Sequence, residues 1–114
     1  MDEEIVYYIS NTRPIKFIFQ DADLGGALNL TGGTLILSIK KEDTHSTPLI
    51  TKTTALPAEA VITNPAGGTV EFYLLAGDTA LLRPGRYIYD IQFDDSTYIS
   101  TLIKAIFNLQ RAIT

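Results

Sequence analysis

The single histidine is the residue of this sequence that most resembles part of a catalytic site. His45 lies in a polar stretch with Asp43 and Ser46, and these are the residue types of a nucleophilic triad. A triad needs a partner that orients the histidine and a nucleophile within reach, and closeness in sequence establishes neither. We therefore interpret residues 42–46 as a surface connection.

The pattern of Asp21 and Asp23, followed by Gly25 and Gly26, resembles the start of a calcium-binding loop. An EF-hand loop also requires a bidentate glutamate at its twelfth position. Counted from Asp21, the twelfth residue is Gly32. The pattern therefore favours a β-turn, which demands Asp and Gly at such positions. A weak calcium site completed by a distant loop stays open as an alternative.

Asp94 and Asp95 form a second acidic pair. Adjacent side chains of an extended segment point apart, so a general acid and base working together are not expected here. No pair of glycines is followed by the Lys-Ser or Lys-Thr of a phosphate-binding loop. We predict no catalytic, metal-binding or cofactor-binding residues, no cofactor, and no enzymatic activity.

Composition restricts the class of protein further. The chain has 114 residues, 46% of them hydrophobic, which suits one globular domain with its own core. It has no cysteine, which excludes disulfides and thiolate chemistry. A net charge of −4 argues against a nucleic-acid partner. The acidic first residues and the lack of a long apolar run predict neither a signal peptide nor a membrane partner.

The elements that would position any site are predicted to be β-strands. Four segments alternate apolar and polar residues with a period of two, which gives each strand one face for a core. Turn residues such as Gly32-Gly33 and Asn64-Pro65 separate these segments. We predict an all-β fold of seven to eight strands. Its core is expected to contain Phe17, Phe19, Leu35, Leu37, Val70, Phe72, Tyr87, Tyr89 and Ile91.

The last segment alternates less regularly. As a strand, residues 98–109 would turn one set of side chains inward. Residues 102–111 also fit helical spacing, but the β-forming residues Thr97 and Tyr98 at the start favour a strand. The inward set of that strand would be Ile99, Thr101, Ile103, Ala105, Phe107 and Leu109.

Shorter elements are expected between the main strands. Residues 49–54 fit an edge strand, and the Asp94-Asp95-Ser96 segment fits a tight hairpin. Residues 77–82 form the one plausible helical turn, with Asp78 as its N-cap. Tyr87 occupies the place of a corner tyrosine, whose hydroxyl would tie that crossover to the strand.

Four tyrosines provide material for an interaction surface. They are Tyr7, Tyr8, Tyr73 and Tyr98. Tyrosine is equally used in sandwich cores and at their edges, so a structural role is an equal alternative.

Three ordered motifs resemble the immunoglobulin-like domain of tailed-phage baseplate and tail proteins, similar to the N-terminal domain of baseplate upper proteins. The likeness covers residues 11–107, and Asn29 stands where that family commonly has Asp. The motifs are Leu30-Thr31-Gly32-Gly33, Gly68-Thr69-Val70-Glu71-Phe72 and Pro84-Gly85-Arg86-Tyr87-Ile88-Tyr89. The structural motif residues taken from this likeness are Leu30, Thr31, Gly32, Gly68, Val70, Phe72, Asp78, Pro84, Gly85, Tyr87 and Tyr89.

The resemblance implies an immunoglobulin-like antiparallel β-sandwich over residues 11–114, with residues 1–10 as an N-terminal arm or edge strand. It also implies a non-enzymatic virion structural module of a bacteriophage tail, baseplate or head appendage. The expected partners are other virion proteins and copies of the same chain, so a homo-oligomer located in the virion is expected. The alternative is a carbohydrate- or receptor-binding sandwich for host attachment, which would use Tyr73, Tyr98 and loop carboxylates.

Overall fold

Eight β-strands and one helical turn make up this computed structural model, which describes residues 4–20, 26–41, 47–80 and 82–111. The strands follow from the period-two alternation, because each buries its apolar face and exposes its polar face. Their bounds are β1 Ile5–Tyr8, β2 Arg13–Ile18, β3 Thr34–Lys40, β4 Ile50–Thr53, β5 Ala60–Asn64, β6 Thr69–Leu74, β7 Gly85–Asp94 and β8 Ile99–Gln110. The helical turn, α1, spans Ala76–Thr79.

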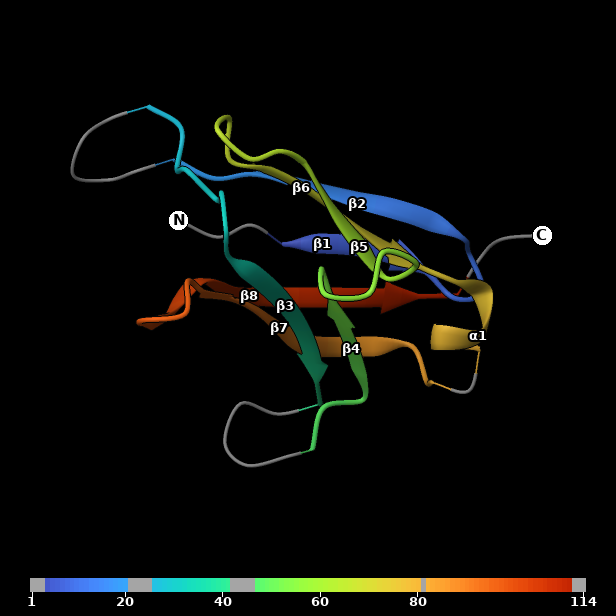
Figure 1. Cartoon of the computed structure of the whole chain (residues 1–114). Helices are drawn as coiled ribbons and strands as arrows, with labels where there is room; N and C mark the ends of the chain where they lie inside the picture. The colour runs from blue at the N-terminus through green and yellow to red at the C-terminus, as the bar shows by residue number, and fades with distance from the viewer. Residues whose placement is uncertain (1–3, 21–25, 42–46, 81, 112–114) are drawn as a thin grey trace.

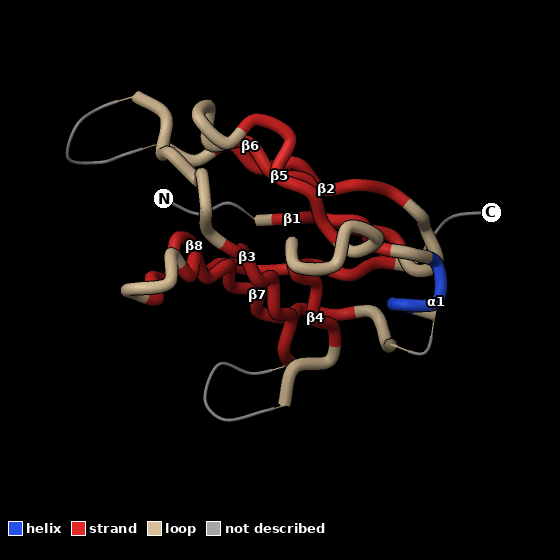
Figure 2. The backbone as a smooth tube through the Cα atoms, viewed as in Figure 1, coloured by secondary structure: helices blue, strands red, loops and turns tan. Residues whose placement is uncertain are grey.

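The strands form two sheets that face each other (Figures 1 and 2). The larger sheet has the order β1-β8-β7-β3-β4, and the smaller has the order β2-β6-β5. In the letter scheme of immunoglobulin domains these orders are G-F-C-C′ for β8-β7-β3-β4 and B-E-D for β2-β6-β5. The fold is therefore the predicted immunoglobulin-like β-sandwich. Among the described strands, β1 and β8 are the one parallel pair.

The core lies between the two sheets. Seven of the nine predicted core residues are buried, and the other two, Phe17 and Phe19, are half-buried against the core. The Phe17 ring meets Phe72 edge-on at 6.0 Å and lies 6.0 Å from Tyr89 of the opposite sheet. Phe17 is less buried than predicted because β2 is an edge strand of the smaller sheet.

The final segment is a strand, as favoured, but two of the six residues of its predicted inward set are wrong. Phe107 and Leu109 are buried, whereas Ile99 and Thr101 are exposed. The pairing with β7 runs from Ile91–Ile103 directly to Gln92–Thr101, so Leu102 is an extra residue. One extra residue in a strand inverts the faces of the residues that precede it.

The helical turn also corrects one expectation. Leu75, not Asp78, is the N-cap residue of α1. Asp78 acts from the third helical position, where its Oδ2 accepts a hydrogen bond from the Leu75 N–H at 2.7 Å. The same oxygen lies 2.8 Å from Nζ of Lys52 in β4. Asp78 thus joins the crossover to the edge of the larger sheet.

The predicted tyrosine corner is present. The Tyr87 hydroxyl donates a hydrogen bond to the Arg83 carbonyl oxygen at 2.7 Å, one residue past the predicted crossover of residues 77–82. The Tyr87 ring is buried in the core. This bond fixes the start of β7 against the connection that leads from the smaller sheet, as in other sandwiches of this class.

The hairpin between β7 and β8 forms where the Asp-Asp-Ser segment predicted it. The Asp95 carboxylate accepts hydrogen bonds from the N–H groups of Tyr98 at 2.7 Å and Thr97 at 2.9 Å. These two bonds lower the pKa of Asp95 below its ordinary value. Ser96 has a positive φ of 80° in this turn, a conformation that is less common for a residue with a side chain than for glycine.

The edges of the larger sheet are two short strands. β4 lies at one edge, within the predicted edge strand of residues 49–54, and β1 lies at the other. The N-terminal residues 5–8 are therefore an edge strand, one of the two alternatives expected from the sequence.

Candidate interaction surface

The residues that the sequence singled out for chemistry do not assemble a site in the described part of the chain. Asp21, Asp23 and His45 lie outside the described residues. Asp94 and Asp95 hold the backbone of their own hairpin. Among residues 4–20, 26–41, 47–80 and 82–111, no group of three acidic or histidine side chains is placed to hold a metal ion. No described helix has the length and apolar character to cross a membrane.

Tyr7 corrects the predicted tyrosine surface, because it is fully buried. Its ring stacks on Phe107 with 5.8 Å between ring centres, and the Arg13 guanidinium lies 5.6 Å from its ring. Its hydroxyl donates to the carbonyl oxygens of Asn11, at 2.9 Å, and Leu74, at 3.3 Å. Burial raises the pKa of Tyr7, and the charge of Arg13 opposes that effect.

The other three tyrosines are exposed or half-buried but do not lie together. Tyr8 pairs with Gln110 at the end of β8, whereas Tyr98 precedes the first residue of β8. At about 3.3 Å per residue along a strand, these two positions are about 40 Å apart. Tyr73 belongs to β6 of the smaller sheet. No single surface therefore contains the predicted set.

The structural motif residues serve the sandwich itself. Gly32 and Gly68 take positive φ in turns, and a Cβ on Gly68 would come within 2.4 Å of the Phe19 carbonyl oxygen. Thr31, Pro84 and Gly85 are exposed at turns and strand starts. The buried members of the set are Leu30, Val70, Phe72, Tyr87 and Tyr89.

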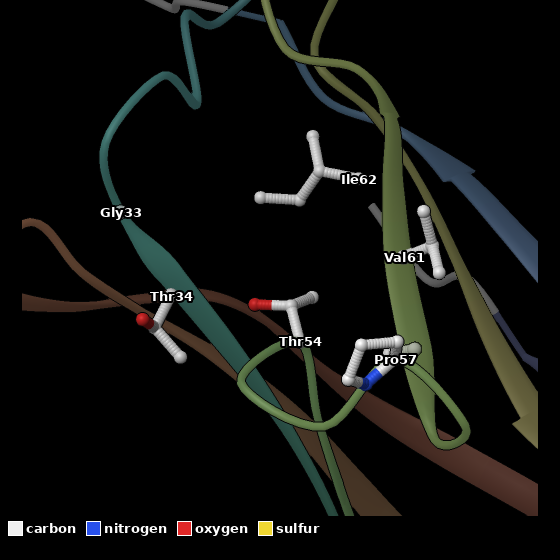
Figure 3. Close-up of a pocket in the computed structure, with 7 residues that line it drawn as sticks. Gly33, Thr34, Thr54, Pro57, Val61 and Ile62 are labelled. Atoms are coloured by element: carbon white, nitrogen blue, oxygen red, sulfur yellow. The ribbon is translucent and has the colours of Figure 1, made fainter.

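One opening between the sheets lies beside β5 and holds about 240 Å³ (Figure 3). Thr54 and Ile62 project into the space between β3 and β5 (Figure 3). The Thr54 hydroxyl oxygen already accepts a hydrogen bond from the Leu35 N–H at 3.0 Å. The lining carries no charged side chain; it consists of Gly33, Thr34, Thr54, Pro57, Ala60, Val61 and Ile62.

A second opening, which we call the β2–β8 groove, lies on the opposite side of the sandwich. It holds about 190 Å³ and separates β2 of the smaller sheet from β8 of the larger. Two half-buried phenylalanines form much of its wall. The groove is lined by Lys16, Phe17, Ile18, Phe19, Leu102 and Ile103.

The β2–β8 groove exists because β1 covers only part of β8. β1 pairs with β8 from Phe107 to Gln110, and β8 continues past the start of β1 (Figure 1). We call residues 98–102 the open segment, because no described strand pairs with them on the side of β8 that β1 occupies further along.

The three most exposed large apolar side chains of the described residues are those of Tyr98, Ile99 and Ile18, which are 72%, 68% and 62% exposed. Tyr98 and Ile99 belong to the open segment, and Ile18 belongs to the wall of the groove. The open segment and the groove together form the candidate contact site. The sequence named Tyr98 for an interaction surface but placed Ile99 in the inward set, because the extra residue Leu102 that turns Ile99 outward is not visible in the pattern.

Comparisons with known proteins show no family for this chain. No protein-family model matches the chain, and no curated protein matches its sequence. Among solved structures, the chain is similar to the crystal structure of the periplasmic chaperone SfaE, with a TM-score of 0.47 and 10% sequence identity. The match covers 98% of this chain and 55% of that one, so the chain spans about half the length of the chaperone. The fold assignment rests on the strand order given above.

Proposed function

We propose that this protein is a non-enzymatic structural and assembly module of a phage virion, as a component of a tail, baseplate or head appendage. The observation that carries the proposal is the open segment of β8 beside the β2–β8 groove. A strand without a neighbour offers backbone donors and acceptors to another chain. The resemblance of the three sequence motifs to baseplate and tail domains supplies the kind of assembly.

The charged groups that are withdrawn from water support an architectural role. Lys52, which is buried, pairs with Asp78, and Asp78 also caps α1. Neither group faces the β2–β8 groove or the opening of Figure 3. Both are therefore used to hold a crossover to the sheet.

The proposal is tested by measuring how many copies of the protein enter purified particles. We expect several copies per particle for the unaltered chain. Ile99→Lys places a charge in the open segment and should reduce the number of copies. Leu56→Lys is the matched control, because Leu56 is an exposed apolar residue in the connection after β4. Absence of the unaltered protein from particles would overturn the proposal.

A second candidate function is attachment to a carbohydrate or receptor. A binding site that uses both Tyr73 and Tyr98 loses support, because the two residues belong to different sheets. The observation that favours the alternative is the opening beside β5, with the hydroxyls of Thr34 and Thr54 in its lining. A glycan array separates the two functions: binding that Ile62→Lys abolishes would favour attachment, and no binding would disfavour it.

A further inference from the structure

We propose that two copies of this chain pair through their open segments, antiparallel, about a two-fold axis at Ser100. The two larger sheets then join edge to edge into one continuous sheet. The inference rests on the proposed assembly function, since it names one partner at the same site. It is tested on the isolated protein, so its failure is distinguishable from failure of the assembly role.

The faces of the open segment are set by its pairing with β7. Ser100 pairs with Phe93, which packs against the core, and Thr101 pairs with the exposed Gln92. By alternation, Tyr98, Ser100 and Leu102 share the face toward the smaller sheet. Ile99 and Thr101 share the outer face. The extra residue is Leu102, so the four residues before it alternate regularly, and Leu102 itself packs against the core.

The open segment is complementary to itself in one register. A two-fold axis perpendicular to a sheet passes between two antiparallel strands and leaves each residue on its own face, so one residue must lie opposite its own copy. With the axis at Ser100, Tyr98 lies opposite Leu102 of the other copy, and Ile99 lies opposite Thr101. Both pairs match in face, and none of the five residues is charged. Apolar and β-branched pairs of this kind stabilise antiparallel strands.

In the same register, the exposed Tyr98 ring of each copy is buried against the other copy. Leu102 lines the β2–β8 groove together with Phe17 and Phe19. Because Tyr98 of one copy lies opposite Leu102 of the other on the inner face, its ring is placed over the other copy's groove. A ring that is 72% exposed in the single chain is thereby removed from water, next to two other aromatic rings.

Charge favours the antiparallel arrangement as well. The hairpin tip, with Asp94 and Asp95, lies before the open segment, and Lys104 lies after it. Lys16 lines the groove beside Leu102. In an antiparallel pair the acidic tip of each copy therefore extends along the basic end of the other. A second copy thus covers the strand edge and the groove together, with opposite charges brought near one another.

The first test is sedimentation of the isolated protein over a range of concentrations. We expect the 12.5 kDa chain to associate to twice that mass as concentration rises. Ser100→Lys brings two positive charges together on the axis and should abolish the association. Leu56→Lys should leave it unchanged, since Leu56 lies outside the open segment. A single chain at every concentration would overturn the pairing.

The second test is a disulfide across the axis. The chain has no cysteine, so an introduced cysteine can form a disulfide only with its copy in another molecule. Opposed residues of antiparallel strands have Cβ atoms about 4.5–5.5 Å apart, close to disulfide range. Ser100→Cys should give a disulfide-linked dimer under mild oxidation. Thr51→Cys, exposed on the edge strand β4, is the matched control and should not.

Two results would overturn the pairing while leaving the assembly function in place. One is equal crosslinking of Ser100→Cys and Thr51→Cys. The other is a Ser100→Cys protein that crosslinks to a different virion protein in particles and stays a single chain in isolation, which would make the occupant of the open segment another protein.

Discussion

Two buried tyrosines show how single residues anchor the sheets. Tyr7 donates to carbonyl oxygens of the chain segments before β2 and at the end of β6, and Tyr87 donates to the segment before β7. In each case an aromatic ring packs in the core while its hydroxyl satisfies a backbone acceptor at the margin. These residues therefore contribute to stability through both burial and hydrogen bonding.

Tyr87→Phe removes only the hydroxyl of the tyrosine corner. We expect a loss of about 1 kcal/mol in the free energy of unfolding, because the Arg83 carbonyl loses its bond while the ring remains packed. Urea denaturation measures this loss. Tyr8→Phe, at a more exposed ring, is the control and should leave the unfolding midpoint unchanged; equal midpoints for both variants would contradict the role of the corner bond.

Phe72→Ala should destabilise the protein by about 3–5 kcal/mol, because it empties the centre of the core. The neighbouring Tyr73 points to the other face of β6, so Tyr73→Ala should cost much less. Chemical denaturation of both variants measures the difference. Similar losses for the two would mean that the assignment of faces along β6 is wrong.

Tyr7 predicts how stability depends on alkaline pH. Its pKa in the folded chain is raised above the ordinary value of 10.0, mainly because burial disfavours the charged form. The contribution of the neutral Tyr7 hydroxyl to the free energy of unfolding is therefore fully present below pH 10. It is lost as the pH rises through the pKa that Tyr7 has in the folded chain. Tyr7→Phe should show a shallower loss of melting temperature above pH 10 than the unaltered chain; identical alkaline profiles would contradict this account.

At the scale of elements, strand positions were predictable and strand neighbours were not. Alternation located β2, β3, β6 and β7, since period two is a local property of sequence. The parallel pairing of β1 with β8 joins residues about one hundred positions apart, and it is what buries Tyr7. The extra residue Leu102 likewise inverts the face of Ile99 without any local sign in composition. The contact site depends on both features, so pattern alone did not reveal it.

The pair between Lys52 of β4 and Asp78 of α1 ties two elements together. Asp78→Ala leaves the buried Lys52 charge without its partner and removes the bond to Leu75, so it should be strongly destabilising. Lys52→Met replaces the charge with an apolar side chain of similar length and should cost less. Thermal melts of the two variants measure the difference, and the opposite order of stability would contradict this interpretation.

At the scale of the whole molecule, the open segment adds an unpaired stretch of β8 to the outer edges of the two described sheets. A small domain with such a stretch beside an apolar groove is suited to a fixed place among other chains. Architecture of this kind is consistent with a protein that works by being held in a multi-copy assembly.

The most direct test of this central claim is quantification of the protein in purified phage particles by mass spectrometry, against a structural protein of known copy number. The account predicts a constant number of copies, several per particle, from one preparation to the next. It predicts a lower number for Ile99→Lys and an unchanged number for Leu56→Lys. Particles that never contain the unaltered protein would contradict the account.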